Sequence, residues 1–279
     1  MPERRTTLLL LAPATLIFLG LFVAPSIYYF IISFWTVRLF KMRPDFTVAN
    51  YARAFTDAHL PTLILTLGLG LSVALLTTVL GFIFAYIIRF KAGRWGPLLL
   101  FVALLTLFGG YLMKIYAWKT ILGTEGVLNT ALIGLGLINQ PLTFLFYNPG
   151  AVVVTLIHFL LPLAILPIYS SMRGISDIEL EAARDLGAGG WRGFSDIVVP
   201  RSRTGLMAAF ALSFLVGSGD YVTPVLVGGT MNMTGNQIVS QFGQIFNWPM
   251  GSALSFVLLG ASLLVILLFS FLLGLWRPR

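Results

Sequence analysis

The sequence predicts an all-α membrane protein with six transmembrane helices. Hydrophobic residues make up 58% of its 279 residues, and charged residues only 10%. A soluble domain of this size needs more charge to cover its surface, so the composition indicates a membrane protein. Six apolar runs approach or exceed the roughly 20 residues that cross a bilayer. The basic residues gather in every second segment between these runs, as lysine and arginine do in cytoplasmic loops.

The first apolar run extends from Leu8 to about Phe34 and follows Glu3-Arg4-Arg5. A secretory signal peptide also has a basic start, but its apolar core is only about 7–15 residues long. The run here has about 25 residues, which is the length of a spanning helix. We therefore predict a retained first span, followed by a polar stretch at 38–60.

The other five predicted spans are separated by polar or basic segments. Pro162 and Pro167 fall inside one of them and are expected to kink its helix. The long segment between the third and fourth spans is expected to contain a short interfacial helix at 126–137. The five spans cover 62–88, 96–113, 151–172, 205–227 and 252–275.

The basic residues predict the orientation of the chain. With the N-terminus inside, twelve of the 18 basic residues lie in inner segments and six in outer segments. Both chain ends and the polar segment at 176–200 are therefore predicted to face the cytoplasm. The inner set is Arg4, Arg5, Arg89, Lys91, Arg94, Arg173, Arg184, Arg192, Arg201, Arg203, Arg277 and Arg279, and the outer set is Arg38, Lys41, Arg43, Arg53, Lys114 and Lys119.

The polar segment at 176–200 has the pattern of two short helices. In the first, Ser176 is predicted to accept from the third helical amide while Glu179 reaches back to the cap. Gly187 stands where this helix should stop, because glycine takes the left-handed conformation of a C-terminal cap at little cost. A narrow apolar stripe at four-residue spacing runs along the helix: Ile178, Ala182 and Leu186.

The second helix of this segment is predicted to end before Pro200, since proline interrupts a helix. Its apolar face would consist of Trp191, Phe194, Ile197 and Val198. On spacing alone, the two helices are equally consistent with an ordinary amphipathic cytosolic loop.

The residues of this segment, however, resemble the EAA signature of ABC importer permeases. Glu181-Ala182-Ala183 is followed four positions later by Gly187, and after nine more residues by Ile197-Val198-Val199-Pro200. Val199 stands where the family has leucine, an apolar residue of similar volume. The resemblance implies a type I ABC importer permease fold whose cytoplasmic coupling helix docks on a separate ATPase. It assigns this coupling to Glu181, Ala182, Ala183, Arg184, Asp185, Gly187 and Pro200.

The same resemblance implies the partners and the domain organisation. The partners would be a second homologous permease subunit, two ATPase subunits that bind ATP and Mg, and a periplasmic or lipid-anchored solute-binding protein. Membrane lipid would surround the chain, a multi-pass protein of the bacterial cytoplasmic membrane. The transport core would run over 61–275, with 1–60 as an N-terminal transmembrane helix and periplasmic segment.

The sequence lacks the residues that chemistry of its own would need. It has no cysteine and two histidines, His59 and His158, with no His-Glu-x-x-His pattern. No G-x-x-x-x-G-K-[ST] loop is present to hold ATP phosphates. We therefore expect a transport subunit that is not an enzyme and holds neither a metal nor a cofactor. The net charge of +8 is attributed to cytoplasmic loops, so no nucleic acid is expected as a partner.

Two further stretches resemble the spermidine/putrescine branch of these permeases. One is Lys114-Ile115-Tyr116-Ala117-Trp118 with the glycines and Asn129 that follow, where Lys114 replaces the usual arginine. The other begins at Gly219-Asp220-Tyr221-Val222-Thr223-Pro224 and continues to Asn247-Trp248-Pro249. The resemblance implies a small cationic solute. It leaves open an opine, another amine or an amino-acid derivative.

Asp220 is predicted to lie inside the fifth span, roughly 22 Å above its cytoplasmic end at 1.5 Å per residue. An intramembrane carboxylate usually faces a water-filled route or a partner group. Asp220 is therefore a candidate substrate contact. The equal alternative is a structural role, either an ion pair or hydrogen bonds to a neighbouring helix, or a helix end at the interface, since Pro224 follows closely. Aromatic rings near it can hold an alkyl-ammonium by cation–π contact, although interfacial belts have the same residues. The further pathway candidates are Tyr111, Lys114, Tyr116, Trp118, Tyr221 and Trp248.

A secondary transporter that needs no ATPase is the alternative class of function. Such a protein relies on intramembrane charges to bind its coupling ions. Only Asp220 fits that requirement, and the EAA-like segment would have no role. A membrane-embedded enzyme is a third class, for which no catalytic set of residues is visible.

Overall fold

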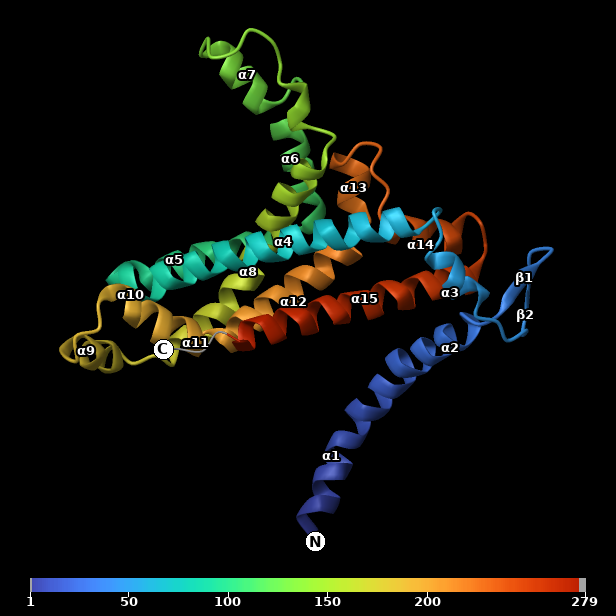
Figure 1. Cartoon of the computed structure of the whole chain (residues 1–279), viewed down its shortest axis with the longest axis horizontal. Helices are drawn as coiled ribbons and strands as arrows, with labels where there is room; N and C mark the ends of the chain where they lie inside the picture. Colours follow the sequence, from blue (N-terminus) through green and yellow to red (C-terminus); the bar gives the residue numbers. More distant parts are fainter. Residues whose placement is uncertain (1, 276–279) are drawn as a thin grey trace. The chain divides into compact units, whose positions relative to one another are not determined.

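The computed structural model describes residues 2–275, with side chains from residue 10 onward, and it is mostly helical (Figure 1). The described residues form two compact units. One contains the residues up to 62 together with 234–260, and the other contains 63–233 and the residues from 261 onward. Arg277 and Arg279, which entered the orientation argument, lie outside the described residues.

The first unit combines the N-terminal helices, a small β-hairpin and part of the C-terminal helix. Its core contains Ala54, Met250 and Leu254, with Ile238 and Val257 packed against them. The hairpin strands are antiparallel, and Arg38 pairs with Lys41. The elements are α1 (Pro2–Phe18), a π-helical turn η1 (Leu19–Val23), α2 (Ala24–Ile32), β1 (Thr36–Arg38), β2 (Lys41–Arg43), α3 (Ala49–Ala54), α14 (Thr234–Gly243) and the start of α15 (Trp248–Leu275).

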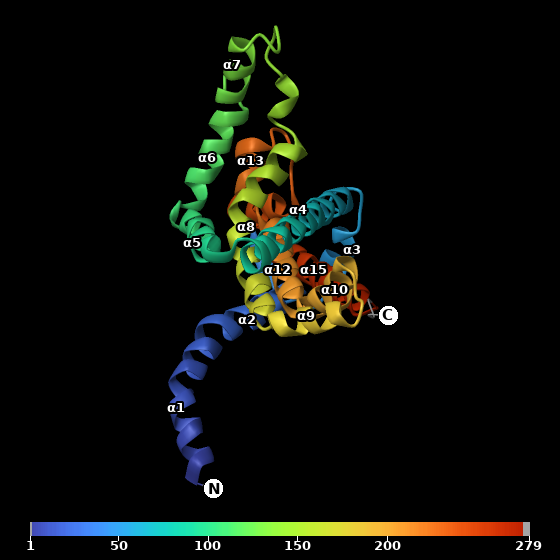
Figure 2. The same ribbon diagram turned by 90° about the vertical axis from the view of Figure 1, so that its left-hand side faces the viewer.

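The second unit is a helical bundle in which α12 runs alongside α8 (Figures 1 and 2). Buried Leu156, Leu160 and Val73 form part of its core. Another core cluster surrounds Ile168 and Met172 near the end of α8. The elements are α4 (Leu60–Tyr86), η2 (Ile87–Lys91), η3 (Gly93–Trp95), α5 (Gly96–Leu105), η4 (Thr106–Phe108), α6 (Tyr111–Leu122), α7 (Val127–Gly134), η5 (Thr143–Leu145), α8 (Pro149–Arg173), α9 (Asp177–Asp185), α10 (Gly190–Gly193), η6 (Phe194–Val198), α11 (Val199–Arg201), α12 (Arg203–Gly219) and α13 (Val222–Val227).

Four helices in the described part of the chain are long and apolar enough to cross a membrane. They coincide with the predicted first, second, fourth and sixth spans. The prolines expected to kink the fourth lie inside one continuous helix, α8. The four helices are Leu10–Ile32, Leu60–Lys91, Pro149–Arg173 and Trp248–Leu275.

The predicted third span at 96–113 is not one straight helix. Gly93–Phe108 and Tyr111–Gly134 meet at an angle of 94°, and α6 and α7 leave the end of α5 in a new direction (Figure 2). The break falls at Gly109 and Gly110, where the backbone leaves the helical conformation. Counting this bent pair as one span brings the candidate spans among the described residues to five. A short helix is present within the expected range 126–137, as α7.

The prediction of one continuous helix over 205–227 is wrong. Helix α12 ends at Gly219, and Asp220 has extended backbone before α13 begins. The physical reason is that the Asp220 carboxylate accepts the amides of Val222 and Thr223. A short polar side chain that binds nearby amides competes with the helical hydrogen bonds. Asp220 therefore lies at a helix end rather than within a helix.

Gly205 sets the closest approach of α12 to α8. A Cβ atom at this position would lie 2.5 Å from the Pro167 carbonyl oxygen and 2.7 Å from the Ile168 Cα atom. Both are backbone atoms, so no side-chain rotation can relieve the clash. Only glycine lets the two helices pack at this distance.

We expect Gly205→Ala to lower the free energy of unfolding by about 1–3 kcal/mol, because overpacking shifts the helix backbones apart. Thermal unfolding in detergent measures the change. Gly68→Ala is the matched control, since a Cβ at Gly68 meets nothing within 4 Å. Equal melting temperatures for both variants would contradict the packing role of Gly205.

Candidate functional site

The first candidate site is the polar segment around α9. Ser176 caps this helix as predicted, but its hydroxyl accepts from the second helical amide, that of Ile178, at 3.2 Å rather than from the third. At the other end Gly187 has φ +85°, as predicted for a glycine cap. The Ala188 amide donates to the Ala183 carbonyl and the Gly187 amide to the Arg184 carbonyl, both at 2.9 Å. This pair of bonds is a Schellman motif, so the sharp end of α9 depends on Gly187.

The predicted return bond from Glu179 to the cap is wrong. Both carboxylate oxygens of Glu179 instead accept from Arg201 Nη2, at 2.9 and 2.8 Å. Arg201 lies 22 residues further on, and its guanidinium offers a stronger, charge-assisted partner than a backbone amide. Glu179 therefore ties α9 to α11.

A second ion pair ties the start of α9 to the end of the α4 helix. Arg89 Nη2 lies 3.0 Å from Asp177 Oδ1 and donates to the Ile175 carbonyl at 2.8 Å. Arg89 belongs to η2, which continues α4. Helix α9 is thus connected through charged side chains to two different helices of the bundle.

The prediction that the second helix ends before Pro200 is also wrong. Helical backbone continues from α10 through η6 to α11, and Pro200 lies in the first turn of α11. The preceding π-helical turn is wider, and the Val199 amide bonds to the Phe194 carbonyl. This wider turn gives the ring of Pro200, which has no N–H to donate, room within the continuing helical backbone.

The apolar stripe predicted on α9 faces away from the bundle. Ile178 is 74% exposed and Leu186 89%, while Leu180 on another face packs against the core. Trp191 of α10 is 73% exposed. Large apolar side chains exposed together are typical of a protein–protein contact surface.

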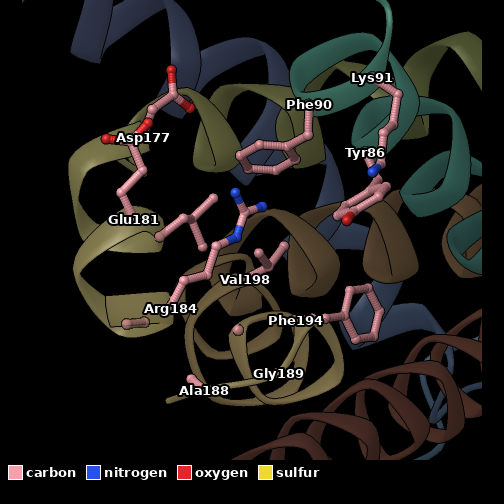
Figure 3. Close-up of a pocket in the computed structure, with 14 residues that line it drawn as sticks. Tyr86, Phe90, Lys91, Asp177, Glu181, Arg184, Ala188, Gly189, Phe194 and Val198 are labelled. Carbon is pink, nitrogen blue, oxygen red and sulfur yellow. The ribbon is translucent and has the colours of Figure 1, made fainter. Parts of the chain in front are cut away.

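A cavity of about 300 Å³ lies between α9, α10 and the end of η2 (Figure 3). Glu181 and Arg184 line it from α9, and Lys91 and Phe90 from η2. The Arg184 guanidinium points into this cavity in Figure 3. Of the other coupling candidates, Ala183 also lines the cavity, whereas Ala182 and Asp185 are exposed on α9.

The second candidate site surrounds Asp220, on the segment between α12 and α13. The Tyr111 hydroxyl donates to Asp220 Oδ1 at 2.5 Å and lies 2.9 Å from the Thr223 hydroxyl. The amides of Val222 and Thr223 donate to the same Oδ1 atom at 3.0 and 3.4 Å. One oxygen of Asp220 thus links α6 to the start of α13.

The other oxygen, Asp220 Oδ2, is buried and has no hydrogen-bond partner among the described residues. Lys114 Nζ, on the next turn of α6 after Tyr111, is likewise buried and without a hydrogen-bond partner among them. It lies 5.5 Å from the ring centroid of Phe159. Buried charged atoms without partners are costly and are often found at functional sites.

The structure brings together only some of the pathway candidates. Tyr111 bonds to Asp220, whereas Tyr116 and Tyr221 are 52% and 47% exposed. Trp118 donates its indole N–H to His158 Nδ1 at 3.1 Å. Trp248 belongs to the first unit.

Sequence reasoning missed the partners that complete these contacts. Thr223 lies inside a stretch already singled out, so its proximity to Asp220 in sequence is the signal that could have found it. Phe159 lies in an apolar helix, and nothing in its sequence neighbourhood indicates the contact with Lys114, 45 positions away. His158 fits the position of a helix-contact residue, but its partner Trp118 lies 40 positions away and could not be identified from the sequence.

The sequence profile of a family described as "Binding-protein-dependent transport system inner membrane component" matches residues 90–279. The spermidine/putrescine transport system permease protein PotB of Escherichia coli strain K12 is 37% identical over 224 residues, 79% of this chain and 81% of that protein. PotB of Haemophilus influenzae is 34% identical over 223 residues, 80% and 77% of the two chains. The inner membrane ABC transporter permease protein YdcU of E. coli is 30% identical over 240 residues, 81% and 76% of the two chains.

Solved structures show the same fold. A chain of a bacterial ABC transporter involved in the import of the acidic polysaccharide alginate aligns with a TM-score of 0.74 at 16% identity. The alignment covers 97% of this chain and 96% of that one. A structure of the bacterial alginate transporter in complex with alginate pentasaccharide-bound periplasmic protein gives the same TM-score and identity, covering 96% and 93%.

Proposed function

Because the chain belongs to the family of binding-protein-dependent transport system inner membrane components, we propose that it forms the translocation pathway of an ABC importer for polyamines such as spermidine and putrescine. The observation that carries this proposal is the 37% identity to PotB over about four-fifths of both chains. The stretches 114–118 and 219–224 add support, because both resemble the spermidine/putrescine branch. ATP and Mg would be bound by two partner ATPase subunits.

Two features of α9 support a coupling role: its apolar side chains are exposed, and two ion pairs attach it to the helical bundle. Its free apolar side chains, Ile178 and Leu186, offer a surface for the ATPase. The ion pairs of Asp177 with Arg89 and of Glu179 with Arg201 connect that surface to the helical bundle. A displacement of α9 by an ATPase would therefore be passed to α4 and to α11, which leads into α12. Rigid-body movement of packed helices is the expected way to alternate access.

The substrate route is proposed to pass Asp220. Its Oδ1 atom accepts hydrogen bonds from Tyr111 and from amides at the start of α13, while Oδ2 has no hydrogen-bond partner among the described residues. Oδ2 is therefore the atom that an alkyl-ammonium group would meet. A second permease subunit would complete the route, and a solute-binding protein would deliver the solute to its outer end.

We expect six spans with both termini in the cytoplasm. The bent pair would count as the third span, and α12 together with α13 would reach across as the fifth. Reporters fused after Arg94 and after Arg192 should be cytoplasmic, and one within 44–54 should be external, following the distribution of basic residues. Paired alkaline phosphatase and fluorescent protein fusions measure each position. A cytoplasmic result for the reporter within 44–54 would overturn this topology.

The choice of solute is tested by uptake in cells that express the chain with its neighbouring transport subunits. Labelled spermidine or putrescine should accumulate, and unlabelled polyamine should compete for uptake. An excess of an opine or an amino-acid derivative should not compete. If one of these solutes competes and polyamines do not, the chain serves another solute of the same importer class.

A further inference from the structure

The β1–β2 hairpin has a turn that its own residues disfavour. Because Arg38 pairs with Lys41, the turn consists of Leu39 and Phe40 alone. Their φ angles are +51° and +60°. A two-residue turn with both φ angles positive is normally built from Asn-Gly, since bulky side chains are strained in this conformation. Leu39 and Phe40 are therefore not explained by the stability of the turn.

The hairpin presents apolar side chains at its tip and basic side chains beside them. Leu39 is 93% exposed and Phe40 is 86% exposed. Arg38, Lys41 and Arg43 are also exposed. Exposed apolar side chains can enter the interface of a membrane, and basic side chains beside them can bind anionic headgroups.

The base of the hairpin is fixed to the end of a helix that can cross the membrane. Asn50 Nδ2 donates to the carbonyl oxygens of Ser33 and Trp35, both at 2.8 Å. The Phe34 and Phe46 rings stack with centroids 4.9 Å apart. These contacts hold the chain just after Ile32, where the apolar helix ends. Since Leu39 follows Ile32 by seven residues, it lies within roughly 24 Å of the helix end.

We propose that the Leu39–Phe40 tip inserts into the headgroup layer of the bilayer and that the neighbouring basic side chains bind the phosphates of anionic phospholipid. A tip that follows a spanning helix by seven residues can reach the bilayer surface, and its basic side chains complement anionic headgroups. Insertion removes the two apolar side chains from water, which offsets the strain of the turn. This role is independent of the transported solute.

The test uses the full chain with its co-expressed partner subunits in nanodiscs of phosphatidylglycerol or of phosphatidylcholine. Hydrogen exchange of the amides at 36–43 should be at least about tenfold slower in phosphatidylglycerol. The double substitution Leu39→Asn, Phe40→Gly should remove this difference, although it supplies the preferred turn residues. In detergent the same variant should exchange no faster than the original chain. Unchanged exchange in detergent shows that the variant still forms the hairpin, so the change seen in phosphatidylglycerol reports the loss of lipid contact.

A depth measurement provides a second, independent readout. The chain has no cysteine, so Phe40→Cys gives a single site for a spin label. The label should be more accessible to oxygen than to a water-soluble nickel complex in phosphatidylglycerol nanodiscs. Equal exchange in both lipids with a water-exposed label would overturn the proposal. Protection that appears only when a solute-binding protein is added would also overturn it and would assign the tip to that protein.

Discussion

Gly187→Val is expected to abolish transport while the chain still inserts into the membrane. Gly187 closes α9 at φ +85°, and a β-branched residue is strongly strained there. The valine would disrupt the Schellman bonds of Ala188 and Gly187 and displace the end of α9. Glu181→Lys should have the same effect by reversing a charge on the proposed docking segment. ATP-dependent uptake and copurification of the ATPase measure the two consequences.

Gly187→Asn is the control for the valine substitution. Asparagine tolerates the left-handed conformation that the end of α9 requires, so the Schellman bonds and transport should persist. If the Gly187→Val and Glu181→Lys variants assemble with the ATPase and transport at normal rates, α9 is not the coupling helix.

Asp220→Asn is expected to reduce polyamine uptake at least tenfold, equivalent to about 1.4 kcal/mol on the limiting step. The amide keeps an oxygen that can accept from Tyr111 and from the two backbone amides. It removes the negative charge that a cationic solute would meet. Uptake per assembled complex should therefore fall, while ATPase stimulation by the solute-binding protein persists, because the docking segment lies in a different part of the chain.

Tyr111→Phe separates the charge of Asp220 from its structural role. This substitution removes the hydroxyl that bonds to Oδ1 and leaves the carboxylate in place. It should lower uptake less than Asp220→Asn does. If instead Asp220→Asn reduces the amount of assembled complex and leaves uptake per complex unchanged, Asp220 is a structural residue of the α12–α13 connection.

Apolar run length was enough to predict four of the helices that can span a membrane. It could not predict the interruptions. The break at Gly109 and Gly110 and the end of α12 at Asp220 lie within apolar sequence that also fits a continuous helix. At Asp220 the helix ends because the carboxylate captures nearby amides, a choice between two hydrogen-bonding patterns that composition does not reveal.

In the α9 segment, contacts between near neighbours in the sequence were predictable, and contacts between distant residues were not. Ser176 and Gly187 act through neighbouring backbone, so their roles as caps were predictable. Glu179 pairs with Arg201 and Tyr111 with Asp220, across 22 and 109 residues. Periodicity cannot identify such partners. The cost of an intramembrane carboxylate and the chemistry of aromatic rings singled out Asp220 and Tyr111 as candidates, but their bond required the fold.

The most direct test of the proposed function is ATP-driven polyamine uptake by the purified complex in proteoliposomes. The complex would contain this chain, the second permease and the ATPase subunits, with the solute-binding protein added outside. We expect spermidine or putrescine with the binding protein to stimulate ATP hydrolysis and to accumulate in the vesicles in proportion to ATP consumed. Polyamine accumulation that persists without ATP or ATPase subunits, or stimulation only by an unrelated solute, would contradict the account.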